Sequence, residues 1–469
     1  MVLNLTEERS RVPTQNLETD YLVIGTGAMG LAFADELIRA NPTVRLILVD
    51  KHAKPGGHWN DAYSFVSLHQ PSAYYGVNSI KLGRGGASLA SGMEVLSYFE
   101  RVIDKLLNTG RVQYFSMCEY QGEGVFSSIV TPDQHYSVKV LKKTVDSTYM
   151  NVQVPSTTPP KYAVAPEVNL VPLNELAYMN KAMSNYVVIG AGKTGIDAIL
   201  FLLEQGVPAD NITWIMSNDS WFMERRLLQP GSTYGWLLSQ LDIFCRSNSL
   251  DEVYTQLEDK QIFSRLDDKI KPSKFRCATV STEELSQLRK VRHIVRMGRV
   301  QSIETNEIVL EQGRMPTSSN TLYVDCTANP LAKRDSVPVF DGATITLQSL
   351  LMCQQVFSAS VIAHVENRYA DDQQKNMLCM PVPHPEHHRD YITAMAGTLV
   401  NTLKWERHFS WWLMRSRLSF KHHESIFTVL ICGFKAWRCS TLALKNLRQI
   451  FKEEFPGKIF PGDSPQKGL

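Results

Sequence analysis

The sequence predicts an α/β protein in which one Rossmann-like domain is inserted into another and a helical extension follows. Two copies of one local pattern, an apolar strand, a glycine-rich turn and a helix, begin at Tyr21 and at Tyr186. They are separated by roughly the length of a domain, which is typical of a repeated α/β unit. The composition changes after Tyr391, where the sequence is typical of helices and rich in Trp, Leu and Arg.

The first βαβ unit covers residues 20–50. Residues 21–24 are an apolar strand, residues 31–40 have helical composition, and Asn41-Pro42 ends that helix. A second buried strand runs from Val44 to Val49 and ends at Asp50. A further helix is expected over residues 93–108, where apolar side chains recur at helical spacing.

A proline-rich linker marks the boundary between the two predicted domains. Residues 151–173 contain too many prolines for a regular element. The βαβ pattern then restarts, with strands at 186–189 and 212–216 around a helix at 196–205. We therefore expect a discontinuous first domain, an inserted second domain and a C-terminal helical extension, with the bounds 1–155 and 316–390, 156–315, and 391–469.

Composition excludes several classes of function. The chain has 469 residues, 43% of them hydrophobic, and a net charge of +2, which predicts a globular protein without affinity for nucleic acid or an anionic membrane surface. No apolar run is long enough for a membrane span, and the N-terminal residues have no secretory h-region. The eight cysteines form no CxxC pair, so reduced thiols and a cytoplasmic location are expected.

The first glycine turn has the spacing of a dinucleotide-binding fingerprint. Gly25 permits a sharp turn, Gly27 lets the backbone approach a pyrophosphate, and Gly30 lets the helix pack on the strand. Asp50 is positioned to accept hydrogen bonds from ribose hydroxyls. A glycine-rich turn of another α/β fold is the alternative. The predicted site also includes the neighbouring residues Ala28, Met29 and Lys51.

The next segment indicates which dinucleotide binds there. Gly56-Gly57-His58-Trp59 follows the acid at Asp50, and this order resembles the flavin monooxygenase group, which comprises the flavin-containing, Baeyer–Villiger and N-hydroxylating enzymes. The resemblance implies that Gly57, His58 and Trp59 line an FAD site; a surface loop with an exposed Trp is the alternative. Residues 56–71 contain no cysteine, which argues against a thioredoxin- or glutathione-reductase mechanism.

The second glycine turn predicts a second dinucleotide site. A phosphate-binding P-loop would need glycine at position 187, where Val187 lies inside the strand. Residues 190–195 instead fit a second fingerprint, whose predicted ligands are Gly190, Gly192, Lys193, Thr194 and Gly195.

The end of the next strand bears on the choice of nicotinamide cofactor. No acid stands at Ser217, and a guanidinium of Arg225 or Arg226 could meet a 2′-phosphate, so NADPH is preferred over NADH. In the family an Arg usually occupies the position of Ser217. A solvated helix face is the alternative for the two arginines.

A third motif lies late in the chain. Residues 322–328 resemble the apolar strand and Ala-Thr-Gly segment by which these flavoproteins return to the FAD domain, with Cys326, Thr327 and Ala328 in place of that triplet. Residues 357–364 are then expected in a last helix whose N-terminus points at the flavin. The resemblance covers roughly residues 20–365. Residues 165–173 lack the Gly and His of the family's F-x-G-x-x-x-H-type motif, and the chain looks more like uncharacterised FAD/NAD(P)-binding proteins of fungi and actinomycetes.

Candidate catalytic groups follow the Gly-Gly-His-Trp loop. Related enzymes place such groups near the isoalloxazine, so His69 is expected to exchange a proton near neutral pH and Asn78 to hydrogen-bond a flavin hydroperoxide, with Gln70 beside the cofactor. Loop residues that hold the backbone are the alternative. His384, His387 and His388, and the pair His422-His423, lack metal-ligand spacing, and we expect solvated loops and no metal site.

The resemblance implies a reaction as well as a fold. NADPH would reduce FAD, and a flavin C4a-peroxide formed with O2 would oxygenate a small organic substrate. Two alternatives remain: a flavin-dependent oxidase or dehydrogenase that does not use the nicotinamide, and a non-catalytic binding protein on the same fold, similar to the escort proteins of prenylated GTPases.

Overall fold

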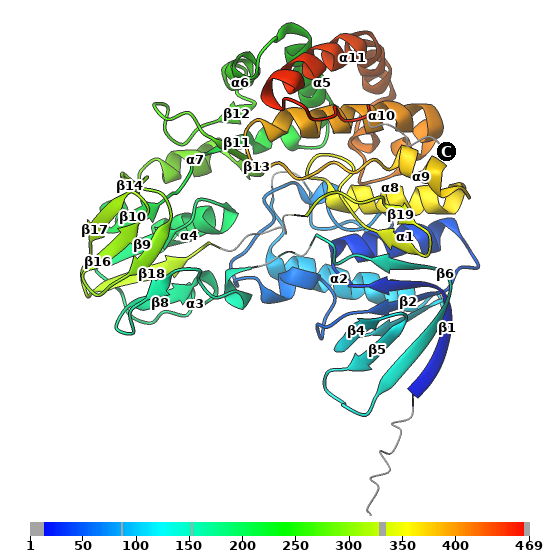
Figure 1. The fold of residues 1–469 in the computed structure, drawn as a ribbon, viewed down its shortest axis with the longest axis horizontal. Coiled ribbons are helices and arrows are strands. Elements are labelled where there is room, and N and C mark those ends of the chain that lie inside the picture. The colour runs from blue at the N-terminus through cyan, green and yellow to red at the C-terminus, as the bar shows by residue number, and fades with distance from the viewer. Residues whose placement is uncertain (1–13, 86–87, 151, 153, 328–333, 464–469) are drawn as a thin grey trace, which may run out of the picture.

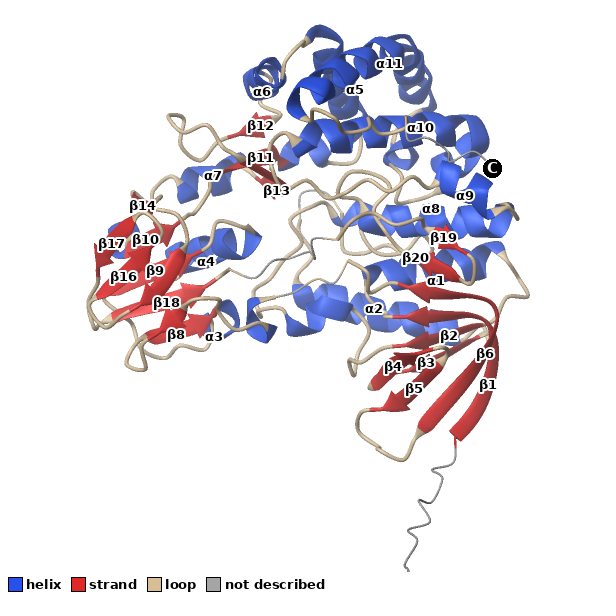
Figure 2. Ribbon diagram, viewed as in Figure 1, coloured by secondary structure: helices blue, strands red, loops and turns tan. Residues whose placement is uncertain are grey.

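The structure, a computed structural model, describes residues 14–85, 88–150, 152, 154–327 and 334–463. Two α/β units lie on either side of a central region of loops, and a layer of helices lies above the first unit and this central region (Figures 1 and 2).

The first unit is a sheet in the order β19-β20-β6-β1-β2-β3, with a β4–β5 hairpin attached to β6. Strands β3, β2, β1, β6 and β20 are parallel, which is the 3-2-1-4-5 order of a dinucleotide-binding fold. Its strands are β1 (Thr14–Ile24), β2 (Leu46–Val49), β3 (Val112–Phe115), β4 (Cys118–Gly122), β5 (Val125–Ser128), β6 (His135–Asp146), β19 (Phe340–Asp341) and β20 (Thr344–Thr346), and its helices are α1 (Ala28–Ala40), α2 (Gly92–Leu107), α8 (Gln355–Arg368) and α9 (Asp372–Leu378).

Side chains along β1 point alternately to the two faces of the sheet, and each face packs against a different apolar cluster. Tyr21 and Val23 belong to the large core that contains α1, α2 and α8, whereas Leu22 packs under the β4–β5 hairpin with Phe126. The helix expected over 93–108 is α2, which begins with a capping box between Ser91 and Glu94.

The second unit repeats this topology. Its sheet has the order β14-β10-β9-β18-β8 with all strands parallel, so β9, β10, β14 and β18 take the places of β1, β2, β3 and β6. A second sheet, β17-β16-β15-β7, packs beside it. The elements are β7 (Ala163–Val164), β8 (Asn169–Pro172), β9 (Asn185–Ile189), β10 (Ile212–Ile215), β14 (His293–Val295), β15 (Val300–Ile303), β16 (Glu307–Leu310), β17 (Gly313–Pro316), β18 (Thr321–Asp325), α3 (Leu173–Leu176), α4 (Lys193–Glu204) and α7 (Thr282–Leu288).

The predicted boundary at residue 316 is therefore wrong. Strand β18 lies between β9 and β8 in the second sheet, and the chain rejoins the first sheet only at β19. The error arose because an apolar strand followed by a polar turn looks the same whichever sheet it completes.

A third core joins the end of the chain to the insertion. The three-stranded sheet β12-β11-β13 and helices α5 and α6 share one apolar cluster with α10 and α11. Helix α10 also reaches the first core through Trp405 and Leu413, so the predicted extension ties two units together. The elements are β11 (Ser220–Glu224), β12 (Phe263–Ser264), β13 (Lys274–Val280), α5 (Thr233–Arg246), α6 (Leu250–Asp259), α10 (Asp390–Arg415) and α11 (Ile426–Glu454).

Two further expectations concern the chain as a whole. Cys277 and Cys353 are joined as a disulfide, so the expectation of eight reduced thiols is wrong for this pair. Within the described residues no single helix is long and apolar enough to cross a membrane, although Ile426–Ala436 and Arg438–Glu454, bent by 47° to each other, meet that test together.

We predict that Lys375→Met lowers the free energy of unfolding by about 3–5 kcal/mol, because it leaves the Glu366 carboxylate buried and without its cation. Lys375 and Glu366 are 2.6 Å apart with only 4% and 5% of their side chains exposed, and Tyr21 also donates to Glu366. Urea unfolding measures the effect. Lys271→Met, which breaks an exposed pair with Asp251, should cost at most about 1 kcal/mol; equal losses would contradict the prediction.

Candidate functional site

The first glycine turn is held by close backbone approaches. Gly25 has φ +92° and donates its N–H to Val49 at 2.8 Å. A Cβ at Gly30 would lie 2.2 Å from the Gly25 carbonyl oxygen, so only glycine lets α1 pack this closely on β1. Ser147, which follows β6, donates its hydroxyl to Gly25 at 2.7 Å. The turn therefore sits where the order of the strands reverses, between β1 and β6.

Asp50 ends β2 as predicted, but its carboxylate is already engaged. One oxygen accepts from the N–H and hydroxyl of Thr26 at 2.5 and 2.8 Å, and the other lies 2.8 and 2.9 Å from the N–H and ring of His52. Burial opposes ionisation, yet these hydrogen bonds lower the pKa of Asp50. Ribose hydroxyls would have to displace Thr26 or His52, so in this conformation Asp50 fixes the turn.

The Gly-Gly-His-Trp loop lies against the first turn. The Gly56 N–H donates to Thr26 at 2.9 Å, and the Gly57 Cα lies 3.7 Å from where a Gly27 Cβ would stand. Trp59 is buried and donates its indole N–H to Tyr75 at 2.7 Å, so it is not the exposed Trp of the alternative interpretation.

Two other residues predicted at the FAD site, His58 and Lys51, differ in their exposure to solvent. His58 is partly buried, and burial lowers its pKa to about 4, whereas Lys51 is exposed.

The second turn repeats the geometry of the first. Gly190 has φ +121°, and a Cβ at Gly195 would lie 2.1 Å from the Gly190 oxygen. Cys326 follows β18 as Ser147 follows β6, and each donates its N–H to the last residue of the central strand, Ile189 or Ile24. Cys326 and Thr327, predicted at the FAD site, therefore belong to the second turn. Ala328 lies outside the described residues.

Both turns end in open helix N-termini. Gly27 and Gly192 are the N-cap residues of α1 and α4, and in these fully described helices neither has a side-chain cap or an acid in the first turn. By contrast, α2 and α7 carry complete capping boxes. Uncapped N–H groups and the positive end of the helix dipole favour a bound phosphate.

The first residues of α1 and α4 differ in their contacts and burial. Lys193 pairs with Asp197 one turn along α4, and Tyr63 from the first unit also donates to Asp197. Met29 is buried, whereas Ala28 and Thr194 are partly buried at the open ends of the two helices.

Arg225 does not face a nucleotide. It is 8% exposed, forms a two-point ion pair with Glu284 at 2.8 and 2.6 Å, and donates to the backbone oxygens of His69 and Thr279 at 3.0 and 3.2 Å. Its predicted role as a ligand of a 2′-phosphate is replaced by one of holding residue 69 in place. Arg226 and Ser217 are exposed and remain candidates for that phosphate.

His69 stands between the two units. Its carbonyl oxygen accepts from Arg225 and Thr279, and its Nδ1 is buried with no hydrogen-bond partner among the described residues. Burial, with the charges of Lys193, Arg225 and His384, lowers the pKa of His69 to about 3. The ring is neutral at pH 7, so it does not match the predicted proton exchange.

Gln70 and Asn78 have different surroundings. Gln70 accepts from Gln354, the N-cap residue of α8, at 3.2 Å, and Gln354 Oε1 is buried without a partner in the described part of the chain. Asn78 instead donates to Glu36 in α1 and accepts from Ser416 after α10, each at 2.9 Å. Its amide is engaged in this hydrogen-bond network, so in this conformation Asn78 is not free to bind a flavin hydroperoxide.

The loop at 384–388 is not a solvated segment. Glu386 pairs with Lys274 at 3.0 Å and with Arg276, both on β13, and the ligand atoms of His384, Cys277 and Cys353 lie within 4.8 Å of one another. No pattern in the sequence connects these residues, because 76 positions separate the two cysteines.

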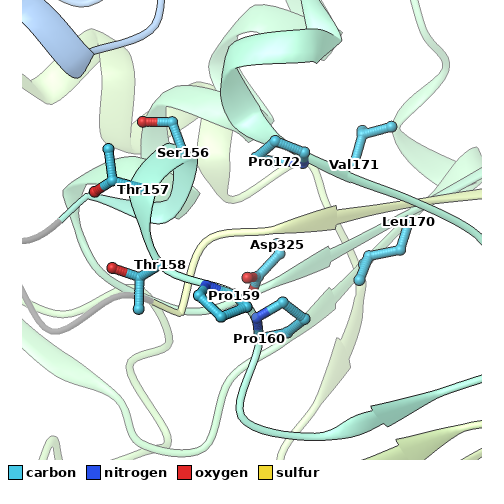
Figure 3. Close-up of a pocket in the computed structure, with 9 residues that line it drawn as sticks. All are labelled: Ser156, Thr157, Thr158, Pro159, Pro160, Leu170, Val171, Pro172 and Asp325. Carbon is cyan, nitrogen blue, oxygen red and sulfur yellow. The ribbon is translucent and has the colours of Figure 1, made fainter. Parts of the chain in front are cut away.

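A pocket of about 410 Å³ opens at the carboxyl ends of β8 and β18, beside the second turn (Figure 3). The Asp325 carboxylate accepts from Tyr162 at 3.1 Å and lies beside Pro159 and Pro160, with the three hydroxyl side chains on one side and the residues of β8 on the other. Ligands of open α/β sheets bind at this edge. The lining residues are Ser156, Thr157, Thr158, Pro159, Pro160, Leu170, Val171, Pro172 and Asp325.

These features together fit two dinucleotides. Each turn combines a switch point in the sheet, close glycine packing and an uncapped helix, and among the described residues His69 Nδ1 and Gln354 Oε1 are buried without a partner. Buried polar atoms without partners are rare in folded proteins, so both atoms are suited to contact a bound molecule.

Comparison with known proteins gives relatives of two kinds. The uncharacterized protein Rv2000 of Mycobacterium tuberculosis (strain ATCC 25618 / H37Rv) is 45% identical over 425 residues, which are 87% of this chain and 78% of that protein. The uncharacterized protein Mb2023 of Mycobacterium bovis has the same identity and coverage. No protein-family model matches the chain.

Solved structures with a related arrangement include two flavoenzymes. The flavin-containing monooxygenase from Stenotrophomonas maltophilia is 14% identical with a TM-score of 0.45, and the match covers 75% of this chain and 98% of that chain. The polycyclic ketone monooxygenase from the thermophilic fungus Thermothelomyces thermophila is 11% identical with a TM-score of 0.48, covering 92% and 90%.

We predict that Gly195→Ala destabilises the protein by about 1–3 kcal/mol, because the new methyl group collides with the Gly190 carbonyl and moves α4. Gly235→Ala is the matched control: it lies in α5 with no described atom within 4 Å of the new methyl group, and should stabilise by about 0.5–1 kcal/mol. Urea unfolding of the two variants decides; equal stability would contradict the packing argument.

We also predict an acid-sensitive contribution from Glu386. Burial alone would raise its pKa, but Arg276 and Lys274 lower it from 4.5 to about 2. A depressed pKa in the folded state stabilises the protein above about pH 4.5, and this stabilisation is lost as the pH falls towards 2. Unfolding measured at pH 7 and pH 3 should show wild type losing about 2 kcal/mol more than Glu386→Gln; parallel losses would refute this.

Proposed function

This chain belongs to the family of the uncharacterized mycobacterial protein Rv2000, and we propose that it is a flavin-dependent oxidoreductase that uses FAD and NADPH. The observation that carries the proposal is the repeated switch-point geometry: two glycine turns, each followed by an uncapped helix, in two sheets with the same strand order. One dinucleotide site would serve a simple dehydrogenase, whereas two such sites fit electron transfer from one nucleotide to another.

FAD is assigned to the first unit. The turn at Gly25–Gly30 and the N-terminus of α1 would hold its pyrophosphate, and the loop at 56–59 would cover it, since that loop is bonded to Thr26. Helix α8 lies beside α1 and has Gln354 as its N-cap residue, so Gln354 Oε1 would contact the flavin end of the cofactor.

NADPH is assigned to the second unit. The turn at Gly190–Gly195 and the N-terminus of α4 would hold its pyrophosphate, and exposed Arg226 would meet the 2′-phosphate in place of Arg225. Lys193, the first residue of α4, is one of the charges that lower the pKa of His69, so we infer that this end of the second site faces the segment His69–Gln70.

The reaction class we propose is a monooxygenation of a small organic substrate with O2. Bound flavin supplies two-electron redox chemistry and reactivity towards O2. His69 would contribute a neutral ring whose free Nδ1 makes a hydrogen bond, and Arg225 would hold that ring at its position. Asn78 has no part in this proposal.

Anaerobic stopped-flow mixing of the yellow protein with NADPH or NADH, followed by oxygenated buffer, tests the proposal. We expect rapid bleaching of the flavin by NADPH and reoxidation that is coupled to product only when the right substrate is present. Failure of both nucleotides to bleach the flavin would refute hydride transfer, and a protein that carries no FAD would refute the function altogether.

Arg226→Ala tests the 2′-phosphate assignment. Loss of this charge should weaken NADPH binding about tenfold and leave NADH binding unchanged, because only NADPH carries the additional phosphate. Arg292→Ala, an exposed arginine at the amino end of β14, is the control and should change neither affinity. Equal effects on both nucleotides would contradict the assignment.

A further inference from the structure

The disulfide joins two units that are far apart in the chain. Cys277 lies in β13 of the three-stranded sheet, and Cys353 immediately precedes Gln354 at the start of α8. Their Cα atoms are 6.5 Å apart, within the usual range for a disulfide. Cys277 is buried and Cys353 is partly buried, so the bond lies mostly inside the protein.

A histidine stands beside the two sulfurs. One ring nitrogen of His384 lies within 4.8 Å of both, and its Nδ1 is 3.1 Å from the carbonyl oxygen of Pro385. The loop that carries His384 is fixed by the ion pairs of Glu386 with Lys274 and Arg276. The disulfide is therefore accompanied by an imidazole that the strand carrying Cys277 holds in place, and burial lowers the pKa of His384 to about 4, so the ring is neutral at pH 7.

Residues close to the two cysteines are hydrogen-bonded to the segment His69–Gln70. Thr279, two residues after Cys277, donates its hydroxyl to the His69 carbonyl oxygen, and Gln354, next to Cys353, donates to Gln70 at 3.2 Å. Thr279, close to Cys277, and Gln354, next to Cys353, thus contact the consecutive residues His69 and Gln70.

Helix α8 also relates Cys353 to the first turn. Ser360, about one turn into α8, donates to the oxygen of Ala32, about one turn into α1, at 3.5 Å. Further along, Trp412 stacks on His364 of α8 and donates to Glu36 of α1. The helices are therefore parallel and begin at the same level, so Cys353 lies at the end of α1 that faces the proposed FAD site.

The other cysteines argue against an oxidising environment. Cys118, Cys245, Cys326, Cys379 and Cys439 are free thiols in the described part of the chain, although Cys245 Sγ lies 3.3 Å from the Cys439 carbonyl oxygen. In compartments where such thiols stay reduced, a disulfide is usually catalytic or redox-sensing rather than a structural cross-link.

We propose that Cys277 and Cys353 form a redox-active dithiol–disulfide pair that accepts two electrons from NADPH by way of the bound flavin. This rests on the proposed function, which supplies the electrons. In the net reaction NADPH and one proton are consumed, the S–S bond breaks, each sulfur becomes a thiol, and NADP⁺ is released. The pair would store a second pair of electrons within the enzyme.

Counting electrons and thiols tests the proposal. The holoprotein is oxidised with ferricyanide, freed of it, and titrated anaerobically with NADPH while the flavin colour is followed and thiols are alkylated for mass spectrometry. We expect complete bleaching after about two equivalents of NADPH, with Cys277 and Cys353 as the newly labelled residues, because flavin and disulfide are each two-electron couples. Bleaching at about one equivalent without new thiols would overturn the inference and leave the proposed function intact.

Variants and the apoprotein separate the remaining explanations. Cys353→Ser should bleach at about one equivalent, whereas Cys118→Ala, which removes a free buried thiol, should still take about two. Protein stripped of flavin should form no new thiol with NADPH; equal thiol formation there would overturn the route through the flavin. If Cys353→Ser does not fold, the wild-type count decides. A flavin that stays yellow with NADPH refutes the proposed function and this inference together.

Discussion

At both glycine turns a carbonyl oxygen of the turn presses against the helix that follows it. The oxygens of Gly25 and Gly190 lie 2.2 and 2.1 Å from where a Cβ at Gly30 and Gly195 would be, so each helix sits closer to its strand than any side chain allows. This contact fixes where α1 and α4 begin and leaves their first N–H groups pointing out of the sheet. The proposed phosphate sites, the position of the covering loop and the position of Lys193 all depend on it.

The second feature on which the site depends is the ion pair between buried Arg225 and partly buried Glu284. Arg225 and Glu284 satisfy each other, and the remaining guanidinium donors hold the His69 and Thr279 carbonyls. Separating Arg225 from Glu284 would leave a buried charge unpaired, which costs free energy of folding. Arg225 therefore stays in place, and its bond to the His69 carbonyl fixes residue 69 relative to β13. The same segment contacts the first unit through Gln70 and Gln354, which makes it a link between the first unit and the β12-β11-β13 sheet.

The C-terminal helices have a structural role that their composition did not reveal. Helix α10 shares one apolar cluster with the β11–β13 sheet at its beginning and another with α8 at its end. Although α10 is kinked at Phe409, its contacts with both cores restrict how far the units can move apart. The disulfide between β13 and the start of α8 bridges the same two parts, so its redox state would act on a junction that packing already supports.

The sequence by itself determined the local units: both glycine turns, the strands and helices around them, the acid that ends β2 and the absence of a P-loop. These depend on the allowed backbone angles of glycine and on the alternation of apolar residues, which neighbouring positions encode. The tertiary structure alone decided which sheet β18 completes and which polar groups are free. Asp50 is occupied by Thr26 and His52, Asn78 by Glu36 and Ser416, and Cys277 meets Cys353 across 76 residues. Such partners are brought together by packing between units, so local sequence patterns do not predict them.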